Sequence, residues 1–535
     1  MHTPGTDERA APQHLDAPRS PGRHTVRSIV VTLACLLGVL VLAYAIVAVK
    51  LRLTKPVIAV DTVERLRASL PAASAPDEIA WPACRDAFLA LGLAAGDPER
   101  ESPGAKAVDE LPFPGTDAWP AATAWLDAHR PALGAVRDAT RRPVFGFPLA
   151  REFDAADEKL FGADAATNMR TLLATRNDPS KLPILGLLLP HLAKSRAAGR
   201  MLVLDAFQAA EAGDAERFVA DVEATMRLSF HVQEGRFLIC DLVGIAIRSM
   251  ALQRAVAALE WKPDLLDAGQ LLRLQRAFES MPRACRTLNL DAERLMWVDL
   301  EQRLFSDRGD GDGTFLLRTD VLIPLINSMG AASKPRGRAQ SGAGNDGRSV
   351  SPLLAATLLS GPVASVTVAD RRETREFVDT WMRRMEEASA LPLRDRPKIE
   401  ALNAEFHDAI DAAPVRLLLP RVLMPALAQA SSAYARDAAS MDAAAAACAV
   451  LRYRLDHAGA LPARVEDLVP SYLATVPEDP WTGKPARIAT GAGGFSLYSV
   501  GEDLVDGGGD PLNPIDWTWF APRGDFRRWQ EPTER

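Results

Sequence analysis

The stretch "GRFLICDLVGIAIRSMALQRAVAALEW", from Gly235 to Trp261, is apolar around most of its helical circumference. A helix on the surface of a globular protein keeps one polar face, whereas a helix that is apolar on most sides is buried. This stretch therefore predicts the central, buried helix of a helical body. A second segment, "DLLDAGQLLRLQRAFESM", continues the helical pattern after Pro263.

The segment before this central helix has the periodicity of a helix with one packed face. In "AERFVADVEATMRLSFHVQ", residues 215–233, apolar or small side chains recur three and four positions apart. Gly213 predicts the end of the preceding helix, and Asp214 predicts the N-cap of this one. Consecutive antiparallel hairpins fit this layout. Because the repeat of about 34 residues found in tetratricopeptide proteins is absent, we predict an irregular α-hairpin array.

The chain is too long to fold around a single compact hydrophobic core. It has 535 residues, of which 48% are hydrophobic and 24% charged, as in ordinary globular proteins. The net charge of -7 gives no reason to expect nucleic acid as a partner. We predict a disordered tail at 1–27, a transmembrane anchor at 28–49, a linker at 50–79, an α-helical body at 80–428 with a mobile loop at 303–352, a small α+β module at 429–522 and an exposed tail at 523–535.

The predicted anchor is "SIVVTLACLLGVLVLAYAIVAV", Ser28 to Val49. Its 22 residues carry no charge, and a helix of that length spans the hydrocarbon core of a bilayer while satisfying its own backbone. A cleaved signal peptide would have a shorter apolar core. Basic residues flank both ends almost equally, so the positive-inside rule does not decide the orientation. A short tail before a first anchor favours a periplasmic location for residues 50–535 of a bacterial inner-membrane protein.

Motifs for catalysis are not found in the sequence. The eight histidines are scattered, and the five cysteines are too widely spaced for a zinc site or a disulfide framework. The GxSxG elbow, the phosphate-binding GxxxxGK[ST] loop and the dinucleotide fingerprint are absent. The loop "SDRGDGDGTF", residues 306–315, fails as a helix-loop-helix calcium site because Arg308 and Thr319 would occupy ligand positions. We therefore predict a protein that is not an enzyme.

The pattern changes after residue 428. An Ala-rich helix from Ser431 to Gly459 is followed by a short helix at 465–468 and by strands near 486–489, 495–500 and 515–520. Three motifs in this region, "LRYRLDHAGALP", "PEDPWTGKP" and "FSLYSVGED", resemble in their order the globular domain of the type II secretion major pseudopilins. The matching residues are Tyr453, Leu455, Asp456, Gly459 and Pro462, then Pro477, Asp479, Pro480, Trp481, Gly483 and Pro485, then Leu497, Tyr498, Ser499, Gly501 and Asp503.

Two features depart from the pseudopilin pattern. Thr482 is an extra residue in the second motif, and the predicted anchor lies far upstream of the module instead of running into it. The layout of the whole chain is similar to large single-anchor membrane proteins of planctomycete-type bacteria, a resemblance that implies no activity. Within the module we predict that Trp481 fills a small core and that Asp479 holds its own loop.

The acidic stretch "GEDLVDGGGD", residues 501–510, follows the third motif. In the secretion pseudopilins the corresponding loop holds calcium, so the resemblance implies a calcium site here. Calcium takes six to eight oxygen ligands, and glycines allow carboxylates and carbonyls to converge. The ligands implied are Asp503, Asp506, Asp510 and Asp516. The alternative is a solvated turn, since Asp and Gly are also the commonest turn residues.

These features lead to one functional hypothesis and two alternatives. The hypothesis is a single-pass, envelope-facing interaction or assembly protein, whose helical body binds a protein partner and whose module is stabilised by calcium. One alternative is a component of a type II secretion or pilus-like machine, and the other is a membrane-anchored hydrolase with an unrecognised site. The helical body is equally well explained as a scaffold that packs only on itself.

Overall fold

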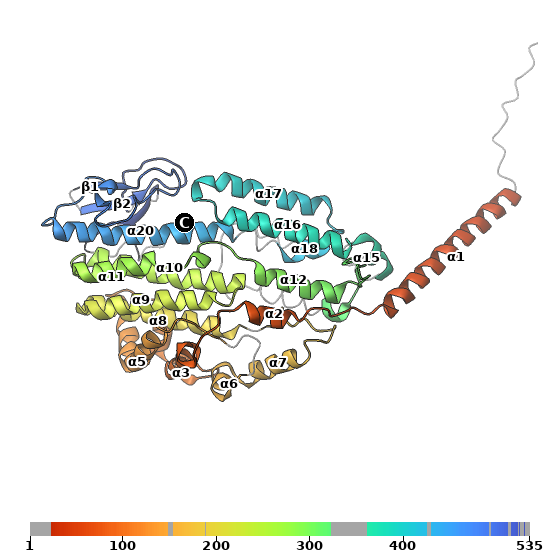
Figure 1. The fold of residues 1–535 in the computed structure, drawn as a ribbon, viewed down its shortest axis with the longest axis horizontal. Helices are drawn as coiled ribbons and strands as arrows, with labels where there is room; N and C mark the ends of the chain where they lie inside the picture. The colour runs from red at the N-terminus through yellow and green to blue at the C-terminus, as the bar shows by residue number, and fades with distance from the viewer. Residues whose placement is uncertain are drawn as a thin grey trace, which may run out of the picture.

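The computed structural model describes residues 23–147, 153–187, 189–322, 361–424, 430–491, 494–511 and 515–522, together with residues 524 and 529. Over these residues the chain is mostly helical, as predicted, with a three-stranded antiparallel sheet near its C-terminal end. The helices lie in layers, and one long helix projects away from them (Figure 1). Most of the predicted N-terminal tail, and the predicted mobile loop from residue 323 onward, lie outside the described residues.

The projecting helix is α1 (Arg23–Leu53), which contains the predicted anchor. Its segment Val30–Leu51 is long and apolar enough to cross a membrane, and none of it is buried. The helix α10 (Leu238–Trp261) meets the same criteria of length and composition, but more than half of it is buried within the body. Two helices of similar composition therefore have opposite environments, and α10 is the central helix that the sequence predicts.

The N-terminal side of the body contains the long helix α5 (Trp119–Ala139) and the shorter helices α2 (Thr62–Ser69), α3 (Trp81–Ala90), α4 (Pro103–Asp109), α6 (Ala155–Phe161) and α7 (Ala163–Ala174). Part of the predicted linker belongs to this side, because α2 packs on α12 (Asp291–Leu304). Thr62 Oγ1 donates to Asp299 Oδ1 at 3.1 Å, and the Gln302 amide exchanges two hydrogen bonds with the backbone of Val60. The chain is thus fixed to the body soon after α1 ends.

The central layer contains α8 (Pro190–Ala212), α9 (Ala215–Gln233), α10 and α11 (Ala268–Glu279). The predicted boundary between α8 and α9 is confirmed. Gly213 has a left-handed φ of 76°, and the Asp214 carboxylate accepts a hydrogen bond from the Arg217 amide at 3.2 Å. Such a cap satisfies a backbone donor that the first helical turn leaves unpaired.

The crossing of α9 and α10 depends on Gly244. A Cβ atom at this position would lie 2.8 Å from the Ser229 carbonyl oxygen, closer than carbon and oxygen atoms pack. Only glycine therefore allows the two backbones to approach this closely. The close approach places the side chains of Ser229 and Gln233 directly against α10.

A second apolar cluster joins α12 to α15 (Gly361–Thr367), α16 (Arg371–Ser389), α17 (Arg396–Ala412) and α18 (Leu418–Leu423). Phe305 and Phe315, which form an antiparallel bridge just after α12, are both buried in it. Residues 303–322 of the predicted mobile loop therefore include part of a helix and a packed turn.

The C-terminal region consists of α20 (Ser431–Asp456) and a sheet of β1 (Arg487–Gly491), β2 (Gly494–Ser499) and β3 (Trp517–Phe520), in the order β1-β2-β3. The role predicted for Asp479 is confirmed, whereas Trp481 belongs to neither apolar cluster of the described residues and lies under the guanidinium groups of Arg396 and Arg436. The Trp481 side chain is buried, and the Asp479 carboxylate accepts hydrogen bonds from the amides of Trp481, Thr482 and Val500. In the predicted exposed tail, by contrast, Trp529 is partly buried and donates to Glu260 of α10 at 2.7 Å.

The body and the predicted C-terminal module share one apolar core. Side chains of α20 and β3 belong to the same buried cluster as those of α8, α9 and α10, and α20 packs along α10 and α11 (Figure 1). At the crossing of α10 and α20, the Arg248 guanidinium bonds to Asp437, with Nη2 2.5 Å from Oδ2. Both side chains are buried, at 0% and 2% exposed.

We expect Asp437→Ala to lower the free energy of unfolding by about 3–5 kcal/mol, because it leaves the Arg248 cation buried without its counter-ion. Urea unfolding of the full-length protein in detergent measures this loss. Asp264→Ala is the matched control: Asp264 pairs with Arg454 of α20 but is 83% exposed, so its removal costs less than about 1 kcal/mol. Equal losses in the two variants would show that the buried pair does not hold α20.

Candidate functional site

The predicted calcium ligands lie on and beyond the loop that follows β2. Asp503 and Asp510 are exposed, while Asp516, just before β3, is buried. Asp516 accepts hydrogen bonds from the Gly507 and Gly509 amides at 3.0 and 2.7 Å. The structure therefore brings Asp516 against the glycine-rich loop.

The carboxylates of this loop bind protein donors. Asp506 Oδ1 accepts from the Tyr498 hydroxyl at 3.1 Å and from the Gly508 amide at 3.0 Å, and Asp503 Oδ1 accepts from the Val505 amide at 3.0 Å. Asp516 in particular has amides on both of its oxygens, the arrangement of a loop brace. Among the residues that the structure describes, no three His, Cys, Asp or Glu side chains converge as a metal site requires. Calcium binding by this loop stays a prediction.

We expect calcium, if it binds this loop, to raise the melting temperature of the full-length protein in detergent relative to a chelator, because a ligand of the folded state stabilises it. The double variant Asp503→Ala, Asp506→Ala would then lose the calcium-dependent shift. The variant Asp307→Ala, Asp310→Ala, in the other Asp- and Gly-rich loop, controls for general effects of acidic surface charge. If calcium leaves the melting temperature of the wild type unchanged, the loop is a turn that binds no calcium.

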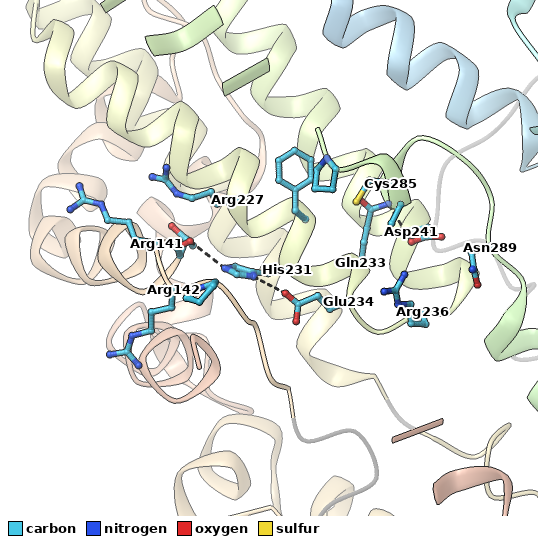
Figure 2. Close-up of a pocket in the computed structure, with 15 residues that line it drawn as sticks. Arg141, Arg142, Arg227, His231, Gln233, Glu234, Arg236, Asp241, Cys285 and Asn289 are labelled. Atoms are coloured by element: carbon cyan, nitrogen blue, oxygen red, sulfur yellow. Dashed lines mark hydrogen bonds and ion pairs between the residues drawn. The ribbon is translucent and has the colours of Figure 1, made fainter. Parts of the chain in front are cut away.

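A different part of the body contains a pocket rich in arginine. It has a volume of about 380 Å³ and lies between the end of α5, the last turns of α9, the start of α10 and the segment 282–289 (Figure 2). Four arginines line it, together with His231, two acids and apolar side chains that include Phe230 and Pro282. The arginines are Arg141, Arg142, Arg227 and Arg236.

The acidic and imidazole groups of this pocket are already engaged by protein partners. Both Glu234 oxygens accept from the Phe145 amide, at 3.0 and 2.8 Å. His231 uses both ring nitrogens: Nδ1 is 3.1 Å from Glu234 Oε1, and Nε2 is 3.2 Å from the Thr140 carbonyl oxygen (Figure 2). Asp241 accepts from Tyr434 and Gln233. These groups are therefore poorly placed to act on a bound molecule.

Among the arginines, Arg142 donates to the Ile79 carbonyl oxygen at 2.7 Å and Arg141 pairs with Asp138 at 3.5 Å, whereas Arg227 is less well compensated. Arg227 has one acid nearby, Glu223 at 3.9 Å, and its buried Nε has no hydrogen-bond partner among the described residues. Burial lowers the pKa of the Arg227 guanidinium. Repulsion from Arg141 and Arg273 lowers this pKa further, whereas attraction to Glu223 opposes the decrease. Mutual repulsion among the cations indicates a positive potential in the pocket, which attracts anions.

Arg236 occupies a strained backbone conformation at the edge of the pocket. Its φ is 62°, in the left-handed region that side chains other than glycine rarely adopt. It lies in the turn between α9 and α10, directly after Gly235, and its side chain is close to Gln233 and Asp241 in Figure 2. Strained residues of this kind concentrate at binding and catalytic sites. An arginine in this conformation at the edge of the pocket favours a role for the guanidinium.

A buried polar network forms the floor of the pocket. The Gln233 amide donates to Asp241 Oδ1 at 3.2 Å and accepts from Arg248 Nη1 at 2.5 Å. The Tyr434 hydroxyl donates to Asp241 Oδ2 at 2.5 Å. Through this network the pocket is connected to the buried ion pair of Arg248 and Asp437.

Burial changes the ionisation of Asp241 and Cys285, which line the pocket, and of Glu293 behind them. It raises the pKa of Asp241 to about 6, although hydrogen bonds from Tyr434 and Gln233 oppose the shift. It raises the pKa of Glu293, whose Oε1 accepts from the Leu238 amide at 2.7 Å, to about 7. It also raises the pKa of the Cys285 thiol to about 11, so Cys285 is a thiol and not a nucleophilic thiolate at neutral pH.

The sequence does not reveal this pocket. Its residues come from four separate segments, and none of them forms a motif. His231 is one of eight scattered histidines, and the arginines have the appearance of ordinary helix-surface residues. The sequence signal nearest to the site is Gly235, which marks the turn between two strongly helical segments.

We expect Glu293→Gln to change how stability depends on pH. The folded-state pKa of about 7 lies above the ordinary value of 4.5, so the folded state binds the proton more tightly than the unfolded state. The stability from this group is complete below about pH 4.5 and falls as the pH rises to about 7. The glutamine variant should lack this fall and should gain stability relative to the wild type above pH 7.

Urea unfolding of the full-length protein at several pH values between 4.5 and 8 measures this change. Glu387→Gln, at an exposed position of α16, serves as the control and should leave the profile unchanged. If Glu293→Gln has the same profile as the wild type, Glu293 is ionised throughout this range in the folded protein.

Comparison of the chain with known protein families, with curated proteins and with solved structures found no match in any of the three. The functional argument therefore depends on the geometry of the chain itself. Two features carry it: an unburied apolar helix at the N-terminal end, and a pocket whose acids accept hydrogen bonds from the protein while Arg227 is poorly compensated.

Proposed function

We propose that this chain is a membrane-anchored binding protein that takes up a small amphipathic anion in the arginine-rich pocket. The observation that carries the proposal is the imbalance between the charges of the pocket. The oxygens of Glu234 and Asp241 accept hydrogen bonds from the protein, whereas the cation of Arg227 has a weak partner at 3.9 Å. A carboxylate or phosphate group would supply the missing acceptors, as guanidinium groups commonly bind these anions.

The apolar part of the pocket determines what the remainder of the ligand resembles. Phe230, Pro143, Pro282 and Ala284 line it beside the arginines. The volume of about 380 Å³ is within the range of small-molecule sites, which combine apolar walls with a few polar groups that fix orientation. A compact ring or a short chain that carries one acidic group matches this lining.

The anchor gives the proposal its cellular setting. We propose that α1 holds the protein in a bacterial inner membrane, with the body in the periplasm. A reporter fused after Arg535 tests the orientation: alkaline phosphatase, which is active only after export, should be active, and green fluorescent protein exported by the general secretion route should be dark. Two results would place the body in the cytoplasm. One is active alkaline phosphatase when it is fused before Met1, and the other is fluorescent green fluorescent protein when it is fused after Arg535.

The packing of α20 makes a binding protein a better proposal than a pilus subunit. A pseudopilin has a membrane helix that runs directly into its globular domain, whereas here α1 and α20 are separate helices with the body between them. One side of α20 is packed on α10 and α11 and is tied down by the buried Asp437. Release of α20 for assembly would expose the core of the body.

We expect the full-length protein in detergent to bind phenyl phosphate and to bind the uncharged benzyl alcohol far more weakly. Isothermal titration calorimetry measures both. Arg227→Gln should weaken the binding of phenyl phosphate by roughly 10- to 100-fold, since a hydrogen bond to a charged group contributes about 1.5–3 kcal/mol. Arg383→Gln, at an exposed position on α16 outside the pocket, is the control and should bind as the wild type does.

Arg236→Gly separates a binding role from a structural one. Glycine relieves the left-handed strain, which offsets its own entropic cost, so the free energy of unfolding should stay within about 1 kcal/mol of the wild type. Binding of phenyl phosphate should nevertheless weaken. If neither Arg227→Gln nor Arg236→Gly affects binding, the arginine-rich pocket is not the anion site.

A further inference from the structure

The short helix α15 lies beside the C-terminal end of α1, and the two helices are in contact (Figure 1). One side of α15 belongs to the body: Ala364 is fully buried in the second apolar cluster, and just after the helix the Ala369 amide donates to the Arg416 carbonyl oxygen at 2.8 Å. The other side presents Val363 and Val366, which are 41% and 75% exposed. The exposed valines are therefore fixed in position by the fold.

The length of the span sets the depth at which α15 lies. The 22 residues of Val30–Leu51 extend about 33 Å as a helix, which matches a hydrocarbon core of about 30 Å. Side chains 30–47 are exposed along this span, whereas Ala48 and Leu51 are partly covered. A helix that contacts the last turns of α1 is therefore at the level where the hydrocarbon core meets the lipid headgroups.

The chain that leaves α1 has the same apolar character. Leu53 and Val57 are 75% and 50% exposed, and the exposed Lys50 and Lys55 lie close to them in sequence. Apolar side chains with flanking lysines are typical of a surface that lies in the headgroup region, where the lysines reach the phosphates. We call Leu53, Val57, Val363 and Val366 the juxtamembrane patch.

We propose that the juxtamembrane patch is inserted into the interface of the bilayer, so that α15 is a second contact between the body and the membrane. The proposal rests on α1 being the anchor of the proposed function. A single transmembrane helix with a free joint would leave the body able to turn in any direction. The second contact fixes one end of the body against the lipid and directs the sheet and the C-terminal region away from it (Figure 1).

Lipid quenching of a fluorophore tests this contact in the full-length chain. A single NBD probe is attached to Val366→Cys in a Cys35→Ser background. The protein is reconstituted in vesicles of phosphatidylcholine and phosphatidylglycerol that contain nitroxide-labelled phosphatidylcholine. The other native cysteines are buried, and burial raises the pKa of Cys84, Cys240 and Cys448 to about 12 and that of Cys285 to about 11, so they react slowly with the label.

Val505→Cys provides the matched control, because it is also an exposed valine, at 57%, but lies on the loop after β2. Headgroup nitroxide should quench the probe at position 366 strongly and the probe at position 505 little. Equal, weak quenching at both positions would overturn the juxtamembrane contact. A probe on the native Cys35 of α1 tests the anchor separately. Nitroxide on the lipid acyl chains should quench this probe if α1 spans the bilayer. An unquenched probe would contradict the proposal that the protein is anchored in a membrane.

Discussion

Burial of the Arg248 guanidinium where α9, α10 and α20 cross is the constraint on which the rest of the structure depends. A cation in a protein core is tolerated only when its donors find acceptors. Arg248 reaches Asp437 on α20 and both Ser229 and Gln233 on α9. The consecutive helices α9 and α10 must therefore meet α20, whose Asp437 lies 189 residues after Arg248. The C-terminal region cannot separate from the body without leaving a charge unpaired in the core.

The same network determines the electrostatics of the pocket. Gln233, which accepts from Arg248, donates to Asp241, and Tyr434 of α20 donates to the other oxygen of that carboxylate. The acid at the floor is therefore held by the protein itself, although its charge also attracts Arg236. An anionic ligand is the complement of such a surface. Its affinity should depend on the packing of α20 although, among the described residues, none from that helix lines the pocket.

The helix α1 and the body are joined with little freedom. The segment after α1 is tied to α12 by Thr62 and by the backbone of Val60, and α15 contacts α1 itself. For the proposed membrane-anchored protein, this attachment fixes the orientation of the pocket relative to the bilayer.

The sequence by itself determined the elements that depend on neighbouring residues. The apolar circumference of residues 235–261, the cap at Gly213 and Asp214, the turn held by Asp479 and the span within α1 are each contained in a short window, so local periodicity and capping chemistry predict them. Tertiary structure decided which of two apolar helices is buried, that Asp516 braces a glycine-rich loop, and that residues from four segments form one pocket. Those outcomes depend on which donors meet which acceptors across the core, and no short window contains that information.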